Sequence, residues 1–328
     1  MDTFVKINVL AYRGCLGAEI FGFADSLLIA QRLAQATSVG DFKPFATRLV
    51  GVEKRTVSIA NDVRIELQPP HRRPDLLVVS GFEFERTAQI RARLQTMRAE
   101  ADYIAAVFRK GTPIAAICVG AFLLAEAGVL NDRRATTAWL FADELARLYP
   151  RVQVQTDAMF VEDGGVITTG AFSSGFDLAV HLLRRNRQID VARMISRMTF
   201  LDAQRHSQAP FKNTALLDRS KGPFSDAVKH WLRERLSTPY DLARCARAFN
   251  VSTRTLLRRF KSETGTSPLR SLQTMRIEAA KQLLVSRNLR IAAVADRVGY
   301  SDPSTFVRLF GREVGHTPAR YRQRFKES

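Results

Sequence analysis

The sequence is poor in cysteine and histidine, the residues that build disulfide frameworks and most structural zinc sites. Its 328 residues include three cysteines and five histidines. Cys15, Cys118 and Cys245 are odd in number, far apart and in no CxxC spacing, so they indicate neither a disulfide framework nor a zinc site. We expect no metal, no cofactor and a reducing, cytoplasmic location.

Long apolar runs are also absent. No segment approaches the roughly 20 consecutive apolar residues that span a bilayer. The first residues, MDTFVKINVLAY, have no basic leader followed by a long apolar run. These absences argue against export and against a membrane partner.

Positive charge, in contrast, is plentiful and unevenly placed. The net charge is +18, and residues 221 to 328 alone hold 22 Lys and Arg against 9 Asp and Glu, a net charge of +13. The length favours two or three domains. A basic segment favours a polyanionic partner, so the last third of the chain is predicted to bind nucleic acid.

The first two hundred residues alternate short apolar runs with helical patterns, which predicts an α/β domain over 1–202 with helices on both faces of a sheet. The runs DLLVVSG and PIAAIC are continuously apolar, which is typical of central parallel strands. The predicted strands are 5–12, 44–50, 75–81, 113–118 and 164–170. The predicted helices are 18–36, 86–110, 119–128, 139–148, 173–186 and 189–200.

Apolar periodicity is lost over 203–222, where we predict a linker. Strand signals are absent beyond it, so residues 223–328 are predicted to form a smaller all-α domain. A cap residue followed by proline favours a helix start. This pair occurs at Thr238-Pro239, Ser267-Pro268, Asp302-Pro303 and Thr317-Pro318.

The all-α segment contains an internal repeat with an offset of fifty residues. STRTLLRRFKSETGTSPLR, from 252 to 270, aligns with DPSTFVRLFGREVGHTPAR, from 302 to 320. Each copy is predicted to be a helix, a tight turn at Asn250 or Gly299, and a second helix, which together make a helix-turn-helix. A long helix, about 268 to 285, joins the two copies.

The outward faces of the two second helices are expected to contact double-stranded DNA. Arginine can contact guanine edges or phosphates, and the first copy carries more charge on this face than the second. The candidate DNA-binding residues are Ser252, Thr253, Arg254, Thr255, Leu257, Arg258, Ser304, Thr305, Val307 and Arg308.

The segment VGYSDPSTFVRLFGREVGHTPARYRQRF resembles the most diagnostic part of the AraC family DNA-binding domain. The resemblance implies two recognition helices in successive major-groove segments, about 34 Å apart. It also implies a sequence-specific transcription regulator, an activator in most relatives, with RNA polymerase as a partner.

The stretch IAAICVGAFLLAEAGVL, from 114 to 130, leads from a strand through Cys118 into a helix, the arrangement of a nucleophile elbow. With DLLVVSG and TTGAFSSGFDLAVHLL, it resembles the class I glutamine amidotransferase-like superfamily of the PfpI/ThiJ type. The resemblance implies a flavodoxin-like three-layer α/β/α sandwich. It also implies an acidic residue beside the cysteine, and Glu19 occupies that place.

A general base is missing from this centre, so we expect no catalysis. Val119 follows Cys118, and Ala138 stands where hydrolytic relatives often have histidine. His71 in a Pro-rich loop, His181 in a helix and His206 in the linker are poor substitutes. Cys118 and Glu19 are therefore candidate relics of an active site, and three interpretations of Cys118 stay open. It is a small buried thiol, an enzyme nucleophile that acts on a small C–N compound, or part of an effector pocket. That pocket would be formed by Glu19, Ser80, Gly81, Cys118 and Val119.

The order of the two parts resembles that of GlxA-type transcriptional regulators. This resemblance implies an α/β domain that forms a homodimer and senses a small metabolite at the carboxyl ends of its strands. The alternatives are a PfpI/ThiJ enzyme with a DNA-binding appendage and a nonspecific nucleic-acid-compacting protein. The missing histidine argues against the first and the internal repeat against the second.

Overall fold

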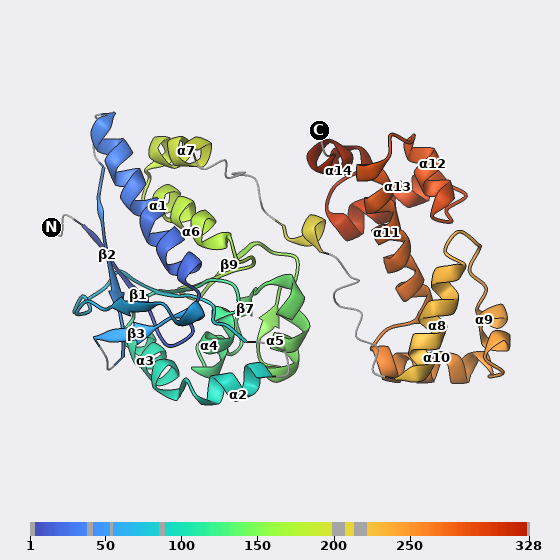
Figure 1. Ribbon diagram of the computed structural model, residues 1–328, viewed down its shortest axis with the longest axis horizontal. Coiled ribbons are helices and arrows are strands. Elements are labelled where there is room, and N and C mark those ends of the chain that lie inside the picture. Colours follow the sequence, from blue (N-terminus) through green and yellow to red (C-terminus); the bar gives the residue numbers. More distant parts are fainter. Residues whose placement is uncertain are drawn as a thin grey trace. The chain divides into compact units, whose positions relative to one another are not determined.

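The chain divides into two compact units, Met1–Gln208 and Ala209–Ser328. Among the described residues, no helix combines the length and apolarity needed to cross a bilayer. Within the same residues, no group of three or more His, Cys, Asp and Glu side chains is arranged to hold a metal ion. The computed structural model (Figure 1) describes residues 4–37, 42–52, 55–84, 89–198, 207–212 and 222–326.

The first unit is built on a six-stranded sheet in the order β2-β1-β5-β6-β10-β9. All neighbouring strands are parallel except β9, which is antiparallel to β10. The central strands β5 and β6 are fully buried, as their continuous apolar runs predict. The strands are β1 (Val5–Leu10), β2 (Phe45–Val50), β5 (Leu76–Val79), β6 (Ile114–Ala116), β9 (Phe160–Asp163) and β10 (Val166–Thr169).

Helices cover both faces of this sheet, so the predicted three-layer α/β/α sandwich is confirmed (Figure 1). Three mutually packed helices lie on one face: α1 (Gly17–Ala36), α6 (Ser174–Arg185) and α7 (Ile189–Met198). The other face carries α2 (Ile90–Gln95), α3 (Arg98–Arg109) and α4 (Gly120–Glu126). The unit also contains α5 (Ala142–Leu148) and the short helix η3 (Trp139–Phe141).

Two features of the first unit differ from the prediction. The single helix expected over 86–110 is two helices, α2 and α3, which are separated at the buried Met97. Several strands were missed because they are too short to show an alternating pattern. They are β9, the hairpin strands β3 (Thr56–Ser58) and β4 (Arg64–Glu66), and the pair β7 (Arg134–Ala135) and β8 (Gln153–Val154).

The second unit is helical throughout its described residues, as predicted. It has two small apolar cores, one for each copy of the repeat, around Leu256 and Phe260 and around Phe306 and Phe310. The helices are α8 (Pro223–Glu234), α9 (Leu242–Ala248), α10 (Thr253–Thr264), α11 (Pro268–Ser286), α12 (Ile291–Arg297), α13 (Pro303–Val314) and α14 (Pro318–Phe325).

Three of the four predicted cap-proline starts are confirmed. The side chains of Ser267, Asp302 and Thr317 accept hydrogen bonds from backbone N–H groups in the first turns of α11, α13 and α14. The start at Thr238-Pro239 is wrong. Thr238 Oγ1 donates to the carbonyl of Arg235 at the end of the preceding helix, and Asp241 caps α9 instead.

Residues 207–212 fall within the predicted linker, but each end of this segment packs in its own unit. Gln208 is 2% exposed in the first unit, where Nε2 donates to the carbonyls of Thr137 and Ala158, both at 2.9 Å. In the second unit, Phe211 of η4 (Ala209–Phe211) stacks edge-on against Phe325. The other predicted linker residues lie outside the described ones, except Gly222, which caps α8.

Candidate nucleic-acid interface and the Cys118 centre

Each copy of the repeat forms the predicted helix-turn-helix, α9 with α10 and α12 with α13. The turns contain Asn250 and Gly299, which have φ of 52° and 85°, in the left-handed region that these residue types tolerate best. Gly299 also has no room for a side chain, because an added Cβ would lie 2.6 Å from the carbonyl oxygen of Leu236. At both positions the residue type therefore fits the left-handed backbone conformation that the turn requires.

Helix α10 buries Leu256 and Phe260 completely and exposes Arg254, Leu257 and Arg258, as the helical spacing predicts. Thr253 is also exposed. The other two candidates on this copy serve the helix start. Ser252 caps α10 by accepting from the backbone N–H of Thr255, and the two hydroxyls are 3.0 Å apart.

The exposed arginines of α10 differ in what they contact. Arg254 and Arg258 form no ion pair with any other residue in the described part of the chain. Arg259 pairs with Glu263 at 3.1 Å and lies over the ring of Phe224. Two arginines of this helix are therefore exposed and form no ion pair within the described residues, and the third contacts neighbouring side chains.

Helix α13 repeats this arrangement with less charge. Phe306 and Phe310 are buried, Ser304 and Arg308 are exposed, and Val307 is half-buried. Thr305 Oγ1 donates to the carboxylate of Asp302, the cap residue, at 2.6 Å. Arg308 is then the one arginine on the outward face of this helix that the described residues leave without an ion pair.

Helix α11 carries two arginines that fix the helix-turn-helix copies and that the sequence did not reveal. Arg270 forms a two-pronged ion pair with Glu313 of the second copy, at 2.8 and 2.5 Å. Arg276 donates to the carbonyls of Leu236 and Thr238 and lies over the ring of Tyr300. These contacts join α11 to the segment between α8 and α9 and to the second helix-turn-helix.

Cys118 lies on a sharp strand-to-helix turn between β6 and α4, as predicted. Its φ is 53°, and its backbone N–H donates to the carbonyl of Thr169 at 3.1 Å. Thr137 Oγ1 donates to the Cys118 carbonyl at 2.9 Å. At Gly120, an added Cβ would lie 2.7 Å from the carbonyl oxygens of Val79 and Ser80. Only glycine therefore allows the first residue of α4 to lie this close to the backbone at the end of β5. The elbow geometry is intact.

The chemistry of this centre is that of a closed core. Glu19 is 1% and Cys118 6% exposed. Glu19 Oε2 accepts from the N–H of Gly81 at 2.5 Å, and its carboxyl lies against the Cys118 thiol. Burial raises the pKa of Glu19 to about 8 and raises the pKa of the Cys118 thiol well above its usual range. A protonated thiol is a weak nucleophile.

The five residues of the predicted effector pocket do meet in space. Tyr12 OH donates to the Ser80 carbonyl, and the backbone of Gly81 is packed so closely against Val119 that a Cβ would lie 2.9 Å from its side chain. All five are buried: Glu19, Ser80, Gly81, Cys118 and Val119. That they bind an effector stays a prediction.

The described histidines of the first unit contact β2 and β9, and not the strand β6 that leads to Cys118. His71 Nε2 lies 2.9 Å from the carbonyl of Ala46 on β2. His181 stacks on Phe160 of β9, with Nε2 3.6 Å from the carboxylate of Glu162, and burial lowers its pKa. His206 lies outside the described residues. The structure therefore supplies no base at Cys118 from His71 or His181.

Comparisons with known proteins match both units. A family model described as the DJ-1/PfpI family matches residues 43–185, and one described as a helix-turn-helix domain matches residues 245–324. The HTH-type transcriptional regulator GlxA of Rhizobium meliloti (strain 1021) is 32% identical over 218 residues, which cover 66% of this chain and 67% of that protein. The chain belongs to the GlxA-type family of transcriptional regulators.

Further relatives agree with this assignment. The HTH-type transcriptional regulator CdhR of Pseudomonas aeruginosa is 28% identical over 271 residues, covering 81% of this chain and 76% of that protein. A solved structure of a transcriptional regulator protein from Vibrio parahaemolyticus covers 60% of this chain and 98% of its own, with a TM-score of 0.50 and 19% identity, and shows the fold alone. The GlxA-type fusion predicted from the sequence is confirmed, and the protein is a DNA-binding transcription regulator.

Proposed function

We propose that this GlxA-type regulator recognises a specific operator through α10 and α13 and activates transcription with RNA polymerase as its partner. The observation that carries the proposal is the pair of repeated helices with exposed arginines that form no ion pair with another described residue, Arg254 and Arg258 on one and Arg308 on the other. The DNA-binding domain is taken as residues 223–328, joined by a linker over 203–222 to a domain of residues 1–202. The protein acts in the cytoplasm as a homodimer formed by the first domain.

The first domain is, in this proposal, a sensor of a small molecule and not an enzyme. Burial keeps the Cys118 thiol and the Glu19 carboxyl protonated at neutral pH, because it raises the pKa of both groups. His71 and His181 are engaged elsewhere. A nucleophile without a base or an ionised thiol cannot drive acyl transfer efficiently.

A fragment of residues 223–328 is expected to bind operator DNA on its own. It contains both recognition helices and most of the net positive charge. Its affinity should fall as salt rises, with a log–log slope of about 0.9 for each phosphate neutralised. Fluorescence anisotropy on an operator selected by the full chain, and on a scrambled duplex of equal length, measures both properties. A folded fragment that binds the two duplexes equally would contradict specific recognition by this domain.

Replacing Cys118 with alanine is expected to leave transcriptional activation unchanged. The change removes one buried sulfur atom, at a cost on the order of 1 kcal/mol of stability. Reporter transcription measures the activity, and Ser196→Ala, which removes one buried oxygen atom on α7, is the matched control for lost packing. Loss of activation in a folded Cys118→Ala protein but not in Ser196→Ala, together with amide or nitrile turnover by the unmodified protein, would support the enzyme alternative.

A further inference from the structure

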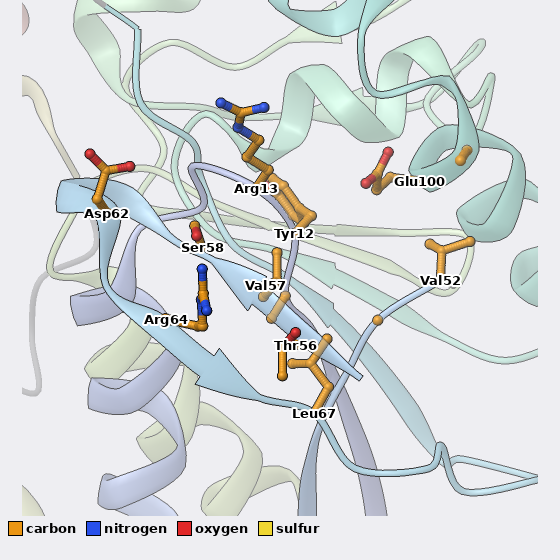
Figure 2. A pocket seen from close by; sticks show the side chains of 13 residues that line it. Tyr12, Arg13, Val52, Thr56, Val57, Ser58, Asp62, Arg64, Leu67 and Glu100 are labelled. Atoms are coloured by element: carbon orange, nitrogen blue, oxygen red, sulfur yellow. The ribbon is translucent and has the colours of Figure 1, made fainter. Parts of the chain in front are cut away.

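A polar cleft of about 530 Å³ lies at the carboxyl ends of β1 and β2. Its walls come from the loop after β1, from the β3–β4 hairpin with η1 (Ala60–Asp62), and from α3 (Figure 2). Cavities of about 300–1,000 Å³ enclose small molecules in proteins, and open α/β sheets bind ligands outside the carboxyl ends of their strands. The size and place of the cleft are those of a small-molecule site.

Charged side chains of both signs line this cleft without neutralising one another. Arg13 follows β1, Asp62 and Arg64 belong to the hairpin side, and Glu100 belongs to α3. None of the four forms an ion pair with another residue in the ranges that the structure describes. Figure 2 shows Arg13 and Tyr12 between the hairpin side chains and Glu100. The lining therefore offers separate cationic and anionic positions.

This lining discriminates between classes of ligand. A polyanion would meet the carboxylates of Asp62 and Glu100, and a hydrocarbon would bury charged groups without pairing them, which is costly. A molecule that carries both a carboxylate and an ammonium group can pair with both signs at once, and guanidinium groups bind carboxylates with two parallel hydrogen bonds. The hydroxyls of Thr56 and Ser58 add donors and acceptors on the hairpin wall.

We propose that this cleft is the effector site of the regulator and that it binds a small zwitterion, such as an α-amino acid. Arg13 and Arg64 receive the carboxylate and Glu100 receives the ammonium group. The proposal rests on the sensor role proposed above and gives it a place and a ligand class. It sets the binding site beside the Cys118 centre, in residues other than the five predicted from the sequence.

The wall of the cleft connects to that centre through buried contacts. Tyr12 lines the cleft, is buried, and donates its hydroxyl hydrogen to the Ser80 carbonyl. The next residue, Gly81, donates its N–H to Glu19, whose carboxyl lies against Cys118. A ligand that displaces Tyr12 would therefore act on the backbone of Ser80 and Gly81, at the packed centre of the sheet.

The test is isothermal titration of the full chain with each of the twenty standard amino acids up to about 10 mM, with succinate and putrescine as probes of a single charge sign. We expect saturable binding of at least one amino acid and none of succinate or putrescine. Glu100→Gln and Arg64→Met should each weaken this binding by at least about tenfold. Arg98→Met, which removes an arginine of α3 that pairs with Asp102 and does not line the cleft, should leave it unchanged.

Three results would overturn the proposal: no amino acid binds, succinate or putrescine binds equally well, or both cleft variants bind like the unmodified protein. Urea unfolding followed by the fluorescence of Trp139, in a Trp231→Phe background, shows that the first unit of each variant is folded. An amino acid that binds in the cleft without changing operator affinity or transcription would support the site and overturn the sensor role. The two failures are thus distinguishable.

Discussion

Replacing Arg258 with alanine is expected to weaken operator binding by about 1 to 3 kcal/mol, a loss of about 5- to 150-fold. Arg258 is exposed on α10 and has no ion pair with another described residue, so its guanidinium group is available for a base edge. Arg254→Ala, one turn earlier on the same helix, should have a similar effect. Fluorescence anisotropy titrations on the operator and on a scrambled duplex, at one salt concentration, measure the loss.

The neighbouring Arg259 provides the control. Its guanidinium group is already used by Glu263 and Phe224, so Arg259→Ala should lower stability and leave the discrimination between operator and scrambled DNA unchanged. Arg308→Ala should cost less than Arg258→Ala, because α13 offers one such arginine where α10 offers two. Equal losses on both duplexes for Arg258→Ala would assign that side chain to phosphate contact and not to base recognition.

The second unit could be predicted closely from the sequence because its signals are local. The repeat aligns turns and caps at a fixed offset, and each signal acts within one helical turn. Asn250 and Gly299 were located as turn residues for this reason. The exception, Thr238-Pro239, also has a local cause, since the Thr238 hydroxyl closes α8 instead of opening α9. The pairing of Arg270 with Glu313 spans 43 residues and left no local signal.

The first unit shows where sequence patterns stop being informative. Continuous apolar runs located β5 and β6, but the strands of the β3–β4 hairpin have three residues each, too few for an alternating pattern. The cleft was not predicted because its charged residues come from three segments that are far apart in the sequence: the loop after β1, the β3–β4 hairpin and α3. The prediction that Glu19 lies beside Cys118 rested on a family resemblance alone. That the centre is closed depends on contacts such as Gly81 with Val119, which join distant parts of the chain.

The stability of the first unit is expected to depend on pH through Glu19. Burial raises its pKa to about 8, against about 4.3 in an unfolded chain. Between these values the folded state holds a proton that the unfolded state releases. The contribution of Glu19 is therefore fully present below about pH 4.3 and is lost as pH rises through 8, which amounts to a few kcal/mol in the free energy of unfolding.

Glu19→Gln should remove this dependence, because a glutamine amide is neutral throughout and its oxygen can still accept from the N–H of Gly81. We expect the variant to lose less stability than the unmodified protein between pH 5 and pH 9, and to be the more stable of the two at the alkaline end. The chain has two tryptophans, Trp139 and Trp231, so fluorescence-detected urea unfolding in a Trp231→Phe background reports on the first unit. Asp25→Asn, at an exposed carboxylate on the same helix, should unfold with the pH dependence of the parent. Parallel pH curves for Glu19→Gln and the parent would show that Glu19 is ionised in the folded protein, and the argument for an inert, protonated Cys118 centre would then fail with it.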